Sequence, residues 1–147
     1  MKLVLDVENT VTDGEGKKHF DPFEPDNKLV MVGMLTETGE EHLYRFDEYV
    51  FGTACVGTKQ KIQEVLDKTT LLIGHNIVHD LLWLWETGYV YSGKVFDTML
   101  GEYVLQRGQK KPLSLEACAE RYNLNTKKQD TLKKYLKDGY GVDEIPK

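Results

Sequence analysis

The hydrophobic and polar positions of residues 1–46 predict three strands. Residues 3–5 form a short apolar run that ends in acidic residues, which predicts a buried strand. Residues 29–36 are mostly apolar, residues 41–46 alternate, and a turn-like segment at 37–40 separates them, so a hairpin is expected. With the first strand beside this hairpin, the chain begins as an antiparallel three-stranded sheet.

The remainder of the chain alternates helical patterns with short apolar runs. Thr58 is expected to cap a helix from Lys59 to about Lys68, because apolar residues recur there at helical spacing. The elements expected after it are a strand at 71–73, a helix at 77–87, a strand at 94–96, and helices at 98–106, 115–122 and 131–137. This order predicts a single α/β domain over residues 1–147 whose sheet mixes antiparallel and parallel strands.

Residues 9–27 differ from both patterns. They are rich in Gly, Asp, Pro and Glu and show no hydrophobic period, so we expect a long polar loop. Loops of this length within a compact domain often carry function.

Length and composition are those of one globular domain. The 147 residues are 40% hydrophobic and 29% charged, which allows a sizeable core. No apolar run approaches the roughly 20 residues of a membrane span, and the N-terminus lacks the layout of a signal peptide, so we expect a cytoplasmic protein without a membrane partner. Cys55 and Cys118 are too few for a disulfide framework or a zinc site and are expected to be buried free thiols.

The net charge of −5 is unevenly distributed. Residues 1–104 carry 9 Lys and Arg against 18 Asp and Glu, whereas residues 105–147 carry 10 against 6, which gives −9 and +4. An acidic half that holds a cation, joined to a basic half, would bring a polyanion to the cation. The alternative is that the lysines of residues 127–137 form only the solvated side of a helix.

Two carboxylates follow the first predicted strand. Asp6 and Glu8 are two residues apart, so in an extended chain they point to the same face. Carboxylates that close repel each other unless a cation neutralises them, and their hard oxygens suit Mg²⁺ or Mn²⁺. The alternative is an ordinary solvated strand end.

A second polar pair opens the helix expected at residues 77–87. Asn76 and Asp80 are four positions apart and therefore share one face of a helix, whereas most of the remaining residues of this helix are apolar. One interpretation is a binding site at the start of the helix. The other is that Asn76 caps the helix and Asp80 is an acid favoured by the helix dipole.

Together these segments resemble a known family. Asp-x-Glu-x-Thr at residues 6–10 and His-Asn-x-x-x-Asp at residues 75–80, in this order among the predicted elements, resemble the DEDD-type 3′-5′ exonucleases of the ribonuclease H-like fold. Residues 96–105 and 113–122 are similar to the N-terminal proofreading domain of family A DNA polymerases of phage type. The resemblance extends over nearly the whole chain.

The resemblance implies a ribonuclease H-like sheet and a metal-dependent enzyme that removes nucleotides from the 3′ end of DNA during replication. It makes Asp6, Glu8 and Asp80 catalytic metal ligands for Mg²⁺ or Mn²⁺, in a site that holds two ions in the family. Asn76 would help to hold the nucleotide, and Thr10 would line the pocket of the terminal nucleotide. A phage-encoded chain of this kind would work in the host cytoplasm.

Other polar residues near these motifs have simpler interpretations. Asp97 lies where the family has an acid between a strand and a helix, and we interpret it as a helix cap. His75 and His79 flank the expected site and are expected to pack or form hydrogen bonds, since a hard cation does not need imidazole.

Aromatic and basic residues offer two further candidates for contact with nucleic acid. Trp83, Trp85 and Tyr89 are expected to belong to the core, although exposed aromatic rings would provide base-stacking surfaces. The basic loop that contains Arg107, Lys110 and Lys111 is a candidate for contact with phosphates, and a merely solvated loop is the alternative.

The third motif of the family has no counterpart in this sequence. The family carries Tyr-x-x-x-Asp or His-x-x-x-x-Asp on a late helix, whereas residues 135–138 and 140–143 are each one position short. We therefore expect a truncated or split domain without the family's C-terminal helix, weakly active or inactive, that holds at most one ion firmly. A DNA polymerase, a complementing C-terminal fragment or another copy of the chain would supply the helix, and the apolar strip left uncovered would favour oligomers.

Two other functions remain open. One is a noncatalytic module of the same fold that binds a single-stranded DNA end or a polymerase. The other is a relative that acts on RNA.

Overall fold

The computed structural model describes residues 1–9, 12–14, 17–19, 23, 27–45 and 56–124. Its strands are β1 (Lys2–Asn9), β2 (Thr12–Gly14), β3 (Lys17–His19), β4 (Leu29–Thr36), β5 (Glu41–Arg45), β6 (Leu71–Gly74) and β7 (Lys94–Asp97). Its helices are α1 (Val56–Asp67), α2 (Ile77–Glu86), α3 (Thr98–Leu105) and α4 (Leu115–Arg121).

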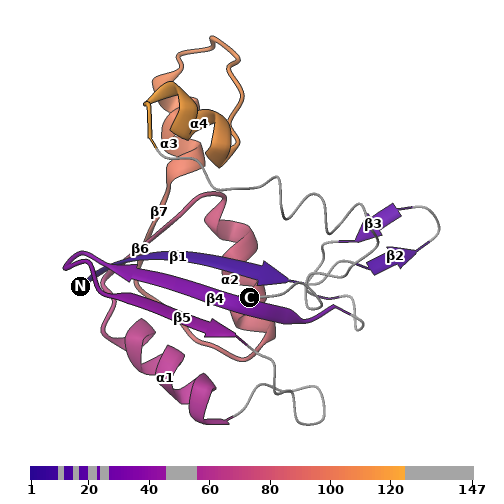
Figure 1. Cartoon of the computed structure of the whole chain (residues 1–147), viewed down its shortest axis with the longest axis vertical. Coiled ribbons are helices and arrows are strands. Elements are labelled where there is room, and N and C mark those ends of the chain that lie inside the picture. Colours follow the sequence, from indigo (N-terminus) through magenta and orange to yellow (C-terminus); the bar gives the residue numbers. More distant parts are fainter. Residues whose placement is uncertain (10–11, 15–16, 20–22, 24–26, 46–55, 125–147) are drawn as a thin grey trace.

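Five strands form one mixed sheet in the order β5-β4-β1-β6-β7 (Figure 1). β1 pairs antiparallel with β4, and β4 pairs antiparallel with β5. On its other edge β1 pairs parallel with β6, which pairs parallel with β7. This is the predicted ribonuclease H-like arrangement of an antiparallel meander joined to two parallel strands, and it is confirmed.

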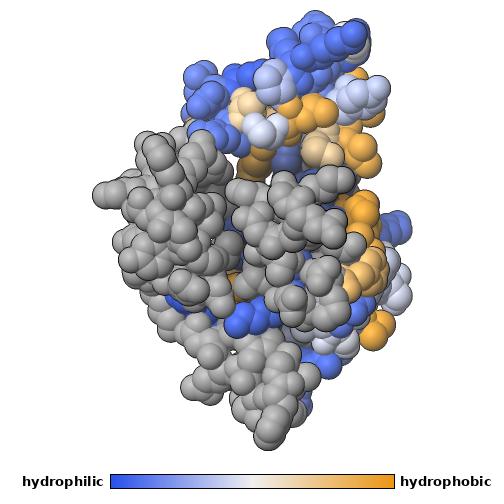
Figure 2. Space-filling view, turned by 90° about the vertical axis from the view of Figure 1, so that its right-hand side faces the viewer, coloured by the Kyte–Doolittle hydropathy of each residue, from blue (hydrophilic) through white to orange (hydrophobic). Residues whose placement is uncertain are grey.

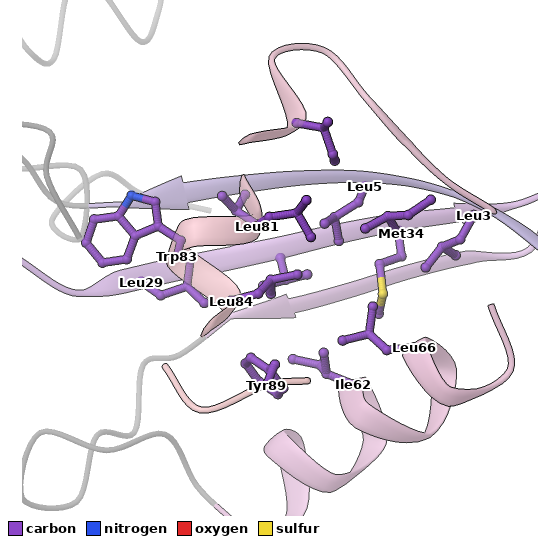
Figure 3. Close-up of a cluster of buried hydrophobic side chains, with 14 residues drawn as sticks. Leu3, Leu5, Leu29, Met34, Ile62, Leu66, Leu81, Trp83, Leu84 and Tyr89 are labelled. Carbon is purple, nitrogen blue, oxygen red and sulfur yellow. The ribbon is translucent and has the colours of Figure 1, made fainter. Parts of the chain in front are cut away.

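The core lies on one face of this sheet. Alternate residues of β1 point into it, and α1 and α2 contribute the apolar side chains that cover it (Figure 3). The buried cluster consists of Leu3, Leu5, Val7, Leu29, Val32, Met34, Ile62, Leu66, Leu72, Ile77, Leu81, Trp83, Leu84 and Tyr89. None of the helices in the described part of the chain is long and apolar enough to cross a membrane.

The helices α3 and α4 stand beyond the end of β7, apart from α1 and α2 (Figure 1). α3 is mostly apolar, yet it has no buried residue. Exposed apolar side chains gather in this part of the molecule (Figure 2): Val95, Phe96, Leu100, Tyr103, Val104, Leu105, Leu115, Tyr122 and Leu124.

Three expectations about local structure are wrong. α1 begins at Val56, three positions before Lys59, so Thr58 lies inside the helix and Gly57 is accommodated there although glycine costs about 1 kcal/mol in a helix. The segment 9–27 contains the antiparallel pair β2 and β3, whose three polar residues each are too short to show a hydrophobic period. Trp85 is 53% exposed, because residues two apart on a helix, here Trp83 and Trp85, point in nearly opposite directions.

Two further expectations about the core are confirmed. Trp83 and Tyr89 are buried, and Cys118 is a buried free thiol. Burial raises the pKa of the Tyr89 hydroxyl to about 12, so this side chain stays neutral at all ordinary pH values. Cys55 and the helix expected at residues 131–137 lie outside the described residues.

Two adjacent residues of β1 provide a test of which face of this strand points into the core. Leu5 is 2% exposed and Val4 is 43% exposed. We expect Leu5→Ala to lower the free energy of unfolding by about 2–5 kcal/mol, because it leaves a cavity, and Val4→Ala to lower it by less than about 1 kcal/mol. Urea unfolding followed by circular dichroism measures both, and equal losses would contradict the assignment of the two faces.

Candidate functional site

The end of β1 carries the first candidate residues. Alternation buries Leu5 and Val7 and places Asp6 and Glu8 on the opposite face, with Asp6 exposed and Glu8 half-buried. Asp6 lies opposite Gly33 of β4. A Cβ added at Gly33 would lie 3.7 Å from Leu43 Cδ1, an ordinary contact distance, so the backbone here is not crowded. The strand therefore presents two carboxylates on one face, as predicted.

β1 extends beyond its parallel neighbour. The pairing of β1 with β6 ends at Val4 opposite Ile73, and β6 itself ends at Gly74. A Cβ at Gly74 would overlap the end of the Ile77 side chain and would lie 3.2 Å from the carbonyl oxygen of Leu5, so a larger residue in this turn would require its neighbours to shift. The turn brings the start of α2 next to the acidic end of β1.

Asp80 lies in the first turn of α2 and is 4% exposed. The residue before it, His79, forms a 3.1 Å hydrogen bond from Nε2 to Oδ1 of Asn9, the residue after Glu8. This bond places the helix turn that carries Asp80 against the end of β1. Within the described residues, however, no three His, Cys, Asp or Glu side chains form a group that could hold a metal ion.

His79 is electrostatically distinct from an exposed histidine. Burial lowers the pKa of its imidazole, and the nearby Asp6 carboxylate opposes that shift only in part. The ring is therefore neutral at pH 7, and its Nε2 carries the hydrogen that Asn9 accepts. Sequence reasoning did not single out Asn9, because a partner 70 positions away leaves no local signal.

Asn76 occupies the N-cap position of α2 in a left-handed conformation, with φ 60° and ψ 50°, and its side chain forms no cap hydrogen bond. The alternative interpretation, in which this side chain caps the helix, is therefore wrong. The carboxylate of Asp97 replaces it, accepting from the backbone N–H of Asn76 at 2.9 Å and of Ile77 at 3.3 Å. The Asn76 side chain is left exposed at the start of α2.

Asp97 also caps the next helix. Its Oδ1 accepts from the backbone N–H of Met99 at 2.9 Å, which confirms the interpretation of this residue as the cap of α3. One carboxylate thus holds the first turns of two helices that follow neighbouring parallel strands.

His75 ties the same junction to α4. Its Nε2 donates to the carbonyl of Leu113 at 2.6 Å, and its Nδ1 lies 2.9 Å from the hydroxyl of Thr98. The hydrogen-bonding roles expected for His75 and His79 are therefore confirmed. A groove of about 360 Å³, mostly apolar, lies beside this contact between β7, α3 and α4.

The basic loop lies between α3 and α4. Its cations Arg107, Lys110 and Lys111 are exposed. The side chain of Gln106 fixes the loop, since its amide donates to the carbonyl of Lys111 at 2.9 Å and accepts from the same residue's N–H at 3.1 Å. Two hydrogen bonds thus hold the loop that carries three exposed cations, which is an arrangement suited to phosphate contact.

A network that sequence reasoning missed joins α3 to α4. Glu102 accepts from Arg121 at 3.0 Å and from the Tyr122 hydroxyl at 2.5 Å. These donors lower the pKa of the Glu102 carboxyl, the Tyr122 hydrogen bond most strongly. Thr10, expected to line the nucleotide pocket, lies outside the described residues.

Comparison with known proteins decides the family. Residues 19–141 match the sequence profile of the family described as 3′-5′ exonuclease. The chain belongs to this family. Asn76 and Asp80 lie inside the matched range, whereas Asp6 and Glu8 precede it. No curated protein sequence matches this chain.

Solved structures share its fold. NrnC from Brucella melitensis is similar with a TM-score of 0.60 and 19% identity, over 87% of this chain and 55% of NrnC. NrnC with bound Mg²⁺ has a TM-score of 0.59 and 18% identity, over 88% of this chain and 57% of NrnC. The family B DNA polymerase from the archaeon Pyrobaculum calidifontis has a TM-score of 0.58 and 17% identity, over 85% of this chain and 18% of the polymerase. The chain thus spans little more than half of NrnC, and these likenesses show a ribonuclease H-like fold.

The double cap formed by Asp97 can be tested by comparison with a single cap. Among the described residues, the Ser114 side chain accepts from a single backbone N–H, that of Ala117 at the start of α4. We expect Ser114→Ala to lower the free energy of unfolding by about 1 kcal/mol and Asp97→Ala to lower it by about 2 kcal/mol or more, because the latter leaves N–H groups of two helices without an acceptor. Urea unfolding of both variants checks this, and an equal loss would contradict the shared-cap assignment.

Proposed function

We propose that this exonuclease domain removes nucleotides from the 3′ end of single-stranded DNA by metal-dependent hydrolysis, in association with DNA replication. The observation that carries the proposal is the match of residues 19–141 to the 3′-5′ exonuclease family. The presence of Asp6 and Glu8 on one face of the central strand supports it.

Exonucleases of this family depend on divalent metal ions, and a structural neighbour binds Mg²⁺. The donor chemistry of this chain fits such an ion, because carboxylate oxygens are the ligands that Mg²⁺ and Mn²⁺ prefer. The described carboxylates do not form a group of three by themselves. We propose that Asp6, Glu8 and Asp80 hold the ion together with oxygens of water and of the substrate phosphate.

The chain's own residues then have separate tasks. The ion supplies the positive charge and the acidified water that phosphodiester hydrolysis needs. Asp6 and Glu8 hold it from β1, and Asp80 holds it from α2. The exposed amide of Asn76, at the start of that helix, hydrogen-bonds the terminal nucleotide. The basic loop binds phosphates of the following nucleotides.

An exonuclease assay tests the proposal. The substrate is single-stranded DNA labelled at its 3′ end, with single-stranded RNA in parallel, in Mn²⁺ or Mg²⁺. We expect slow, metal-dependent release of labelled mononucleotide from DNA, because the third motif of the family is not in the sequence. Asp6→Ala should reduce the rate at least about 100-fold, since it removes a metal ligand.

Asp67→Ala is the matched control, because Asp67 is an exposed acid at the end of α1. Its rate should equal that of the unaltered chain. Faster release from RNA would assign the enzyme to RNA. No release from either substrate, with no calorimetric signal for metal binding, would leave the noncatalytic binding module as the function.

Phosphate contact by the basic loop predicts a change in salt dependence. Replacing Arg107, Lys110 and Lys111 together by Gln should weaken binding of single-stranded DNA about tenfold or more at low salt. The slope of log K against the logarithm of the salt concentration should become less steep by about 2. Each phosphate contact on a single strand contributes about 0.7 to the steepness of this slope, and the variant removes three contacts. Fluorescence anisotropy at several salt concentrations measures both quantities.

The control for that experiment removes equal charge elsewhere. Lys61, Lys68 and Lys94 are exposed and belong to α1, the α1–β6 turn and the start of β7. Their triple Gln variant should keep the salt slope. If the two triple variants lose affinity equally, the effect comes from net charge and the loop makes no specific contact.

A further inference from the structure

One hydrogen bond connects the two chain segments that carry the proposed metal ligands. Nε2 of His79 lies 3.1 Å from Oδ1 of Asn9. Asn9 is the residue after Glu8, and His79 is the residue before Asp80. The bond therefore acts on the immediate neighbours of two carboxylates that lie on different elements.

The bond lies where the parallel ladder of β1 has ended. Among the described residues, the pairing of β1 with β6 stops at Val4, and residues 6–9 pair with β4. The register of that second ladder shifts between Glu8 and Asn9. The bond from His79 therefore joins α2 to the irregular end of the strand.

The bond is also placed where it resists competition from water. Asn9 is 9% exposed, and His79 is half-buried between α2 and β1. A hydrogen bond between such partly buried groups is costly to break, because water cannot easily replace either partner. It therefore fixes the separation between the end of β1 and the first turn of α2.

We infer that His79 and Asn9 are positioning residues, whose hydrogen bond keeps the segment that carries Glu8 beside the segment that carries Asp80, so that both carboxylates can reach one divalent cation. The inference rests on the proposed function. Neither side chain is assigned to the ion itself. Each acts through the backbone of the carboxylate that it adjoins, so loss of the bond should weaken metal binding more than it weakens the fold.

His75 provides a matched comparison. It is also a half-buried histidine, four positions earlier, and it also forms hydrogen bonds from its ring. Its hydrogen-bond partners, however, are Thr98 and Leu113, and neither of them belongs to β1. A histidine that matters only for stability should therefore behave like His75.

The experiment measures Mn²⁺ binding to the full 147-residue chain by isothermal titration calorimetry, and the rise in Tm caused by saturating Mn²⁺. We expect His79→Leu and Asn9→Ala each to raise the Kd for Mn²⁺ about tenfold or more, as changes to groups that orient metal ligands do. The Mn²⁺-dependent rise in Tm should shrink accordingly. His79→Gln keeps an N–H donor at nearly the same place and should recover most of the affinity.

Controls separate the possible failures. His75→Leu should lower the Tm of the metal-free chain but leave the Kd for Mn²⁺ unchanged. If the Asp6→Ala variant binds Mn²⁺ as tightly as the unaltered chain does, both the proposed function and this inference fail. If Asp6-dependent binding is present but His79→Leu and Asn9→Ala keep the full affinity, or match His75→Leu in every measurement, only this inference is overturned. If His79→Leu does not fold, the Kd of Asn9→Ala for Mn²⁺ alone tests the inference.

Discussion

The position of β1 between an antiparallel and a parallel neighbour is the constraint on which the site depends. Because Leu3, Leu5 and Val7 must face the core beneath α1 and α2, Asp6 and Glu8 must face the other side. A shift of one residue in the pairing would bury both acids and expose the leucines. The apolar contacts that stabilise the fold thus also fix the direction of the two carboxylates.

The placement of α2 depends instead on polar contacts at its first turn. Asp97 accepts from the backbone of Asn76 and Ile77, and His79 reaches Asn9 at the end of β1. The first contact ties the helix to the junction of β7 and α3, and the second ties it to the strand that carries the acids. The two strands on either side of β6, β1 and β7, therefore each contribute one side chain to the placement of the helix turn that carries Asp80.

Much of this arrangement could be predicted from local patterns. Alternation in β1 and the acid at Asp97 gave the correct face and the correct cap, because both depend on residues close in sequence. Trp85 was misplaced because an all-apolar helix does not show which side faces the core. The bond between Asn9 and His79 joins residues 70 positions apart, and only the folded sheet brings them together. The roles of Thr10, Asp6, Glu8 and Asp80 stay predictions.

Acidic sites of this kind combine two opposing requirements. Carboxylates must lie close enough to share a cation, yet without the cation they repel each other and destabilise the fold. In this chain the contacts of Asn9, His79 and Asp97 act on backbone segments beside the proposed ligands. These hydrogen bonds can keep the acidic segments adjacent, and in the proposed function a bound cation would supply the attraction that offsets the repulsion between the carboxylates.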